Sequence, residues 1–130
     1  MARIPAFTES EVELAALEWF SRLGYAVLSG PDIAPGEPAA ERESYDQVVL
    51  VGRLREAIGR LNPDVPGEAR EEALRKVLRP ELPMLVANNR AFHRMLVDGV
   101  EVEYRADDGI RGDAVRLVDF DDPSRTTGWW

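Results

Sequence analysis

The stretch "NNRAFHRMLVDGVEVEYR", residues 88–105, changes its pattern in the middle. In its first half, apolar residues recur at helical spacing up to Gly99, where the helix is expected to stop. After that glycine, Val100, Val102 and Tyr104 alternate with charged residues, as in a half-buried strand. A helix that leads directly into a strand predicts an α/β layer structure.

The residues that follow predict a hairpin. "ADDG", residues 106–109, is typical of a turn, and we expect the partner strand at 114–120. "YAVL", residues 25–28, is a further candidate for a short buried strand. A sheet of three strands would leave an open edge, which natural proteins usually cover, so poor solubility or self-association is expected.

Four helices are predicted, the last of them at 84–97. The first begins with a capping box of Thr8 and Glu11 and stops at Gly24. We expect the second helix at 45–61 and the third at 68–79. Two sets of residues are predicted to be buried. These are Val12, Ala16, Trp19, Phe20 and Leu23 on the first helix, and Val48, Val51, Leu54, Ile58 and Leu61 on the second.

Composition limits the class of protein. Of the 130 residues, 45% are hydrophobic and 31% are charged, as in a folded globular chain, and no apolar run is long enough to cross a membrane. There is no cysteine, which fits a cytoplasmic location. The net charge of −8 argues against a free-standing module that binds DNA.

Five ordered blocks carry a resemblance to a known family. They are "TESEVELAALEWFSRLGYAV", "LREAIGRLNP", "EEALRKVLRPE", "NNRAFHRMLVDGVEVEYR" and "RGDAVRLVDFDDP". In this order and at these intervals they resemble the N-terminal region of the R (restriction) subunit of type I restriction-modification enzymes. The resemblance covers residues 7–123, which is nearly the whole chain.

The resemblance implies a fold, an activity and a set of partners. It implies that residues 1–130 form part of a restriction-endonuclease-like domain of the PD-(D/E)xK type, a single incomplete domain with a divergent tail at 124–130. The full-length subunit is then an ATP-dependent DNA translocase and a Mg²⁺-dependent endonuclease. Its partners are the methyltransferase and specificity subunits and double-stranded DNA.

The motifs that perform this chemistry are absent from the chain. It contains no Glu-x-Lys tripeptide and no Gly-x-x-x-x-Gly-Lys-Ser/Thr loop. No catalytic residue is therefore assigned, and residues 1–130 are expected to resemble a truncated reading of a longer gene. We expect this fragment to be inactive alone and to bind neither Mg²⁺ nor ATP by itself.

Glu13 is the one candidate metal ligand. It lies eleven residues before Gly24, an arrangement similar to that of archaeal Holliday-junction resolvases, in which a glutamate on the first helix assists the metal. The alternative is a solvated carboxylate, because Glu9, Glu11 and Glu18 lie on the same helix, whose dipole favours acids near its start.

Other candidates have structural alternatives. His93, the only histidine, is interpreted as a packing or capping residue rather than a general base. The acids Asp119, Asp121 and Asp122 are read as solvated turn residues rather than ligands of a divalent ion. Asn88 and Asn89 are expected to bond a loop or a helix end.

Two groups of residues each have two possible functional interpretations. A basic group could face a DNA backbone or pair with neighbouring glutamates. Its members are Arg70, Arg75, Lys76, Arg79, Arg90 and Arg94, with Glu68, Glu71, Glu72 and Glu81 around them. Trp129 and Trp130 could anchor a partner or be accidental. If they are an anchor, the chain is a small stand-alone acidic protein that docks on a restriction complex.

Overall fold

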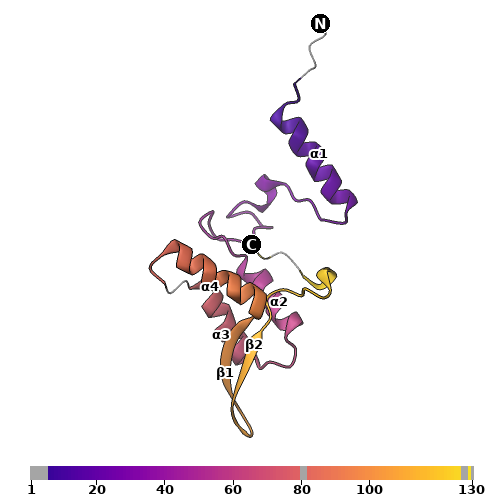
Figure 1. Ribbon diagram of the computed structural model, residues 1–130. Helices are drawn as coiled ribbons and strands as arrows, with labels where there is room; N and C mark the ends of the chain where they lie inside the picture. The colour runs from indigo at the N-terminus through magenta and orange to yellow at the C-terminus, as the bar shows by residue number, and fades with distance from the viewer. Residues whose placement is uncertain (1–5, 80–81, 127–128, 130) are drawn as a thin grey trace. The chain divides into compact units, whose positions relative to one another are not determined.

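The computed structural model describes residues 6–79, 82–126 and 129. The chain falls into two units, Met1–Ala40 and Glu41–Trp130, which are described separately. Figure 1 labels the helices and strands of both units. No helix in the described ranges is both long enough and apolar enough to cross a bilayer.

The first unit contains helix α1 (Glu9–Arg22), which begins as predicted. The backbone N–H of Thr8 donates to the Glu11 carboxylate at 2.7 Å, and the backbone N–H of Glu11 donates to the Thr8 hydroxyl at 3.3 Å. These reciprocal bonds form the capping box. Gly24 follows the helix with a φ of 95°, the left-handed conformation in which glycine is favoured.

The predicted buried face of α1 is wrong. No residue of this helix is buried, and Trp19 is 67% exposed. The reason is that the described part of this unit, residues 6–40, adds only a 3-10 helix, Gly30–Ile33, and so provides no second layer over the apolar face. The strand predicted at 25–28 is also absent; Tyr25 instead packs edge-to-face on Phe20, with 5.6 Å between ring centroids.

Three helices lie in the second unit. They are α2 (Val51–Leu61), α3 (Gly67–Leu78) and α4 (Leu85–Asp98). The last two agree with the sequence prediction to within one residue at each end. Helix α2 begins six residues later than predicted, and Val48 before it is 70% exposed rather than buried. Leu50 is extended because its backbone N–H donates to the carbonyl of Trp129 at 2.7 Å.

The sheet is a two-stranded antiparallel hairpin of β1 (Val100–Ala106) and β2 (Gly109–Val115). Ala106 pairs with Gly109, so the turn has two residues and Gly109 closes it with a φ of 123°. The partner strand therefore begins five residues before the predicted start at Ala114. The mixed α/β fold with a helical N-terminal part and a hairpin is confirmed.

The core of the second unit lies between α2, α3 and the hairpin. Its fully buried members include Leu54, Ile58, Val102 and Leu117. Trp129 completes it: its side chain is 0% exposed and packs edge-to-face on Phe92 of α4, at 6.0 Å between centroids. Figure 1 shows α3 lying along the hairpin.

Asn62 joins the end of α2 to the residue that follows β2. Its side-chain amide donates to the carbonyls of Ile58 at 2.9 Å and of Arg116 at 2.8 Å. Its side-chain oxygen accepts from the backbone N–H of Arg116 at 2.7 Å. Asn62 is 6% exposed, so these bonds satisfy polar groups that water does not reach.

Replacing Trp129 tests the core. We expect Trp129→Ala to lower the free energy of unfolding by about 3–5 kcal/mol, because it empties a fully buried site. Urea unfolding measures this change. The matched control is Trp19→Ala, an exposed site that we expect to change stability by less than about 0.5 kcal/mol. Equal effects from the two substitutions would contradict the burial of Trp129.

Replacing Asn62 tests the link between α2 and the hairpin. We expect Asn62→Ala to lower the free energy of unfolding by about 2 kcal/mol or more, because the backbone groups of Arg116 lose their partner. Asn89→Ala, at an exposed position of α4, is the control. A loss as small as that of the control, measured by urea unfolding, would show that the link is dispensable.

Candidate functional site

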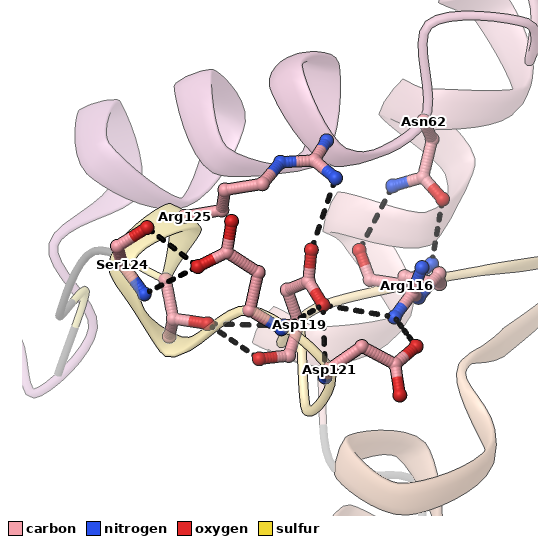
Figure 2. Close-up of polar contacts among 8 residues, drawn as sticks. Asn62, Arg116, Asp119, Asp121, Ser124 and Arg125 are labelled. Carbon is pink, nitrogen blue, oxygen red and sulfur yellow. Dashed lines mark hydrogen bonds and ion pairs between the residues drawn. The ribbon is translucent and has the colours of Figure 1, made fainter.

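The carboxylate of Asp119 is surrounded by donors in the turn after β2. One oxygen accepts from the backbone N–H groups of Asp121 and Asp122, each at 3.0 Å, and from the guanidinium of Arg116 at 3.3 Å. The other oxygen lies 3.1 Å from the guanidinium of Arg125. The Asp119 side chain is only 2% exposed. Figure 2 shows these donors converging on it from both sides.

Further bonds hold the same turn. The side chain of Asp122 accepts from the backbone N–H of Ser124 at 3.1 Å, at the start of the 3-10 helix Pro123–Arg125. The Thr126 hydroxyl bonds both backbone groups of Asp119, at 3.0 and 3.2 Å. Arg60 of α2 donates to the carbonyl of Arg125 at 3.0 Å. The turn is thereby fixed to α2.

The electrostatics of Asp119 favour its ionised form. The backbone N–H of Asp122 has the largest effect in lowering the pKa of Asp119, and the N–H of Asp121 and the charges of Arg116 and Arg125 lower it further, against the opposing effect of burial. Two guanidinium groups already neutralise this carboxylate. They would also repel a divalent cation, so the arrangement stabilises a turn and does not form a metal site.

The described residues do not form a Mg²⁺ site by themselves. Within residues 6–79, 82–126 and 129, no group of three or more histidine, aspartate or glutamate side chains converges as metal ligands would. The alternative that Asp119, Asp121 and Asp122 bind a divalent ion is not supported. The side chain of Asp121 is 95% exposed, and both carboxylate oxygens of Asp119 already contact donors of the protein.

Glu13 lies in the middle of α1 and is exposed. Its side chain makes no hydrogen bond or ion pair within the part of the chain that the structure describes. It differs in this from Glu11, which caps the helix, and from Glu18, which pairs with Arg22. The carboxylate is accessible, and its role as a metal ligand stays a prediction.

His93 and Asn88 both lie on α4. His93 is exposed in the middle of the helix, so it neither packs in the core nor caps an end, and that prediction is wrong. Asn88 bonds the loop as predicted. Its amide donates to the carbonyl of Leu82 at 2.6 Å, and its oxygen accepts from the N–H of Leu82 at 3.0 Å.

The basic residues fall into two groups. Arg75 pairs with Glu72 at 2.6 Å, as the glutamate-pairing alternative predicted, whereas Lys76 donates to the carbonyl of Glu101 at 2.7 Å. Arg90 and Arg94 of α4 are exposed. Arg79, at the end of α3, is exposed as well, and these three arginines form no ion pair within the described residues, so the two interpretations hold for different residues.

The buried position of Trp129 corrects the interpretation of the tail. A side chain that is fully buried against Phe92 cannot anchor a partner protein. Its indole N–H is 3.4 Å from the carbonyl of Leu117, which places the residue in the core. Trp130 and the residues at 127–128 lie outside the described residues.

Sequence reasoning missed three residues that organise this region: Asn62, Arg116 and Arg125. One signal was available, because aspartate and serine beside a proline are typical of turns closed by side-chain bonds to nearby N–H groups. The two arginines carried no such signal. Their partner becomes clear only when the turn is folded back toward α2.

The pH dependence of stability tests the role of Asp119. We expect Asp119→Ala to destabilise the chain at pH 7, because two arginines lose their counterion and two N–H groups lose their acceptor. The pKa of Asp119 is lowered in the folded state. Its contribution is therefore present above the ordinary aspartate pKa of about 3.9 and is lost as the pH falls through the lower folded pKa.

Urea midpoints of wild type and Asp119→Ala at a series of pH values measure this contribution. The difference between them should be largest at neutral pH and should shrink on acidification below about pH 4. Asp121→Ala, in the same turn but with an exposed side chain, is the control and should stay close to wild type. A difference that does not change with pH would contradict the ionic role.

Comparison with known proteins adds the family. Residues 6–127 match the family model described as "Type I restriction enzyme R protein N terminus". The HindI endonuclease subunit of Haemophilus influenzae is 34% identical over 113 residues, 87% of this chain and 11% of that protein. The putative MjaIXP endonuclease subunit of Methanocaldococcus jannaschii is 30% identical over 110 residues, 85% of this chain and 10% of that protein. No solved structure matches. The chain therefore belongs to the family of type I restriction enzyme R protein N-terminal regions.

Proposed function

We propose that this chain is the first part of a subunit that cleaves DNA remote from its recognition site and moves DNA by hydrolysing ATP. The observation that carries the proposal is the match over residues 6–127 to the N terminus of type I restriction R proteins. The chain spans 11% and 10% of the lengths of its two relatives, so these activities are proposed for a longer protein. That protein would use Mg²⁺ and ATP.

The proposed partners are the methyltransferase and specificity subunits, with double-stranded DNA as substrate and the cytoplasm as the location. A subunit without its own recognition function needs partners that select the DNA site. The net charge of −8 supports this division, because the chain as a whole repels phosphate. The exposed Arg90 and Arg94 on α4 are a local exception and are the proposed contacts to a DNA backbone.

We propose that residues 1–130 are part of a restriction-endonuclease-like fold and are inactive alone. The absence of Glu-x-Lys and of a phosphate-binding loop from the sequence supports this. Helices α2 and α3 and the hairpin share one buried core, and the turn at Asp119 fixes the path of the chain after β2. The alternative of a stand-alone docking protein relied on an exposed tryptophan pair and is not favoured by the burial of Trp129.

Glu13 is the proposed contribution of this region to the nuclease metal. It would supply one carboxylate to Mg²⁺, while the other ligands lie outside the described residues. Its exposure and its lack of a partner within those residues leave it free to do so. Glu9, on the same helix and also exposed, has no such proposed role and provides a comparison.

A chimera tests the proposal, with residues 6–127 replacing the matching region of the HindI endonuclease subunit, to which the chain is 34% identical. We expect the chimera, mixed with methyltransferase and specificity subunits, to cleave DNA with Mg²⁺ and ATP. Glu13→Ala should reduce cleavage by about 100-fold and leave ATP hydrolysis unchanged, since a lost metal ligand typically costs a catalytic step that much. Glu9→Ala should change neither rate.

Three outcomes would contradict parts of this proposal. A chimera that assembles but never cleaves DNA would refute the functional equivalence of the region. Cleavage unaffected by Glu13→Ala would refute the metal role alone. Mg²⁺-dependent cleavage by residues 1–130 without other subunits would refute the proposal that this part is inactive by itself.

A further inference from the structure

One edge of the hairpin is open along part of β2. In a hairpin with a two-residue turn, the residues beside the turn form a hydrogen-bonded pair, and such pairs alternate along the ladder. Ala106 and Gly109 are that first pair, so Ile110, Gly112 and Ala114 direct their N–H and C=O groups away from β1. Within the described residues, no other group bonds them. The first six residues of β2 are exposed.

The neighbouring edge positions are capped by side chains. Arg116 is the next residue of the chain with the same outward direction, and the amide of Asn62 satisfies both its N–H and its C=O. On the opposite edge, Lys76 of α3 donates to the outward carbonyl of Glu101 on β1 at 2.7 Å. Natural proteins prevent unwanted strand pairing by covering the free backbone groups at a sheet edge, as these side chains do. Among the described residues, the longest stretch left open on β2 is 110–114, and on the outer edge of β1 Glu103 and Arg105 also make no backbone bond away from β2.

This open segment is complementary to itself. When two copies are placed antiparallel around a two-fold axis at Gly112, each glycine faces the other and no side chains collide there. Arg111 then lies opposite Asp113 of the second copy, and the same pair repeats on the other side of the axis. Ile110, which is 75% exposed, lies opposite Ala114 of the second copy.

The charges at these positions are available. Arg111 pairs with Asp108 at 3.1 Å and also interacts with the Tyr104 hydroxyl, and the side chains of Arg111 and Asp108 are mostly exposed. Asp113 accepts from the Tyr104 hydroxyl at 2.7 Å and has further oxygen lone pairs for a guanidinium. Exposed pairs of this kind hold their side chains weakly, so both can meet an opposite charge across the new pair.

We propose that residues 110–114 pair antiparallel with the same residues of a second copy, forming a four-stranded sheet across a two-fold axis. Backbone bonds from Ile110, Gly112 and Ala114 provide the attraction, and the Arg111–Asp113 pairs set the register. Further pairing through the outer β1 edges is hindered at Glu101, whose carbonyl already accepts from Lys76. A five-residue strand buries less area than a stable interface needs, so the dimer dissociates on dilution.

Sedimentation equilibrium of the 130-residue chain over a range of concentrations tests the proposal. The wild type should pass from one-chain to two-chain mass and no further. Arg111→Asp and Asp113→Arg each place like charges across the axis at two positions and should weaken dimerisation at least about tenfold. The double swap, Arg111→Asp with Asp113→Arg, restores opposite charges and should return to within about threefold of wild type.

The double swap also distinguishes an effect on dimerisation from an effect on folding. It loses the contacts to Asp108 and Tyr104 that the single variants lose, so a recovery of dimerisation cannot come from those contacts. A wild type that stays monomeric, or that forms species larger than dimers, overturns the proposal. Single variants that dimerise as strongly as the wild type would also overturn it. A double swap that is folded but does not regain dimerisation would do the same. Protection of the Gly112 N–H from hydrogen exchange in a monomer would mean that another segment covers the edge, and it also overturns the proposal.

Discussion

The amide of Asn62 takes the place of a strand partner for Arg116, and the rest of the second unit depends on this contact. It joins the last turn of α2 to the chain just beyond β2 with two bonds to the same residue. The next residue, Leu117, then enters the core, and Asp119 follows two positions later. An asparagine can do this because one planar side chain offers a donor and an acceptor in the geometry of a peptide group.

Polar contacts after this point return the chain to its starting helix. Arg116 contacts Asp119, and Asp119 contacts Arg125 (Figure 2). The carbonyl of Arg125 in turn accepts from Arg60 of α2. The circuit begins and ends on one helix, so the turn between the two arginines is fixed at both sides. Only the Asp119 carboxylate of this circuit is buried; its desolvation opposes the attraction of the two arginines, which stay about half exposed and screened by water. The circuit therefore defines the path of the chain more than it adds stability.

The sequence was informative where the signals are local. The capping box at Thr8, the helices α3 and α4 and the stop at Gly99 depend on spacing and on a few residue types, and they were predicted. The register of the hairpin was not, because residues 110–114 are exposed on both faces and carry no alternating apolar pattern to mark a strand. The core position of Trp129 and the partners of Asp119 depend on residues distant in sequence, which no local pattern specifies.

Lys76 is the only lysine of the chain, and its ammonium group lies on the backbone of β1. Reagents that acylate lysine would therefore modify a single side chain of the fold, remove its charge and weaken its bond to the Glu101 carbonyl. The outward carbonyl of Glu101 would then be as open to a further strand as the outward groups of Glu103 and Arg105. One ammonium group on a helix thus makes the only side-chain hydrogen bond to the outer backbone edge of β1 within the described residues.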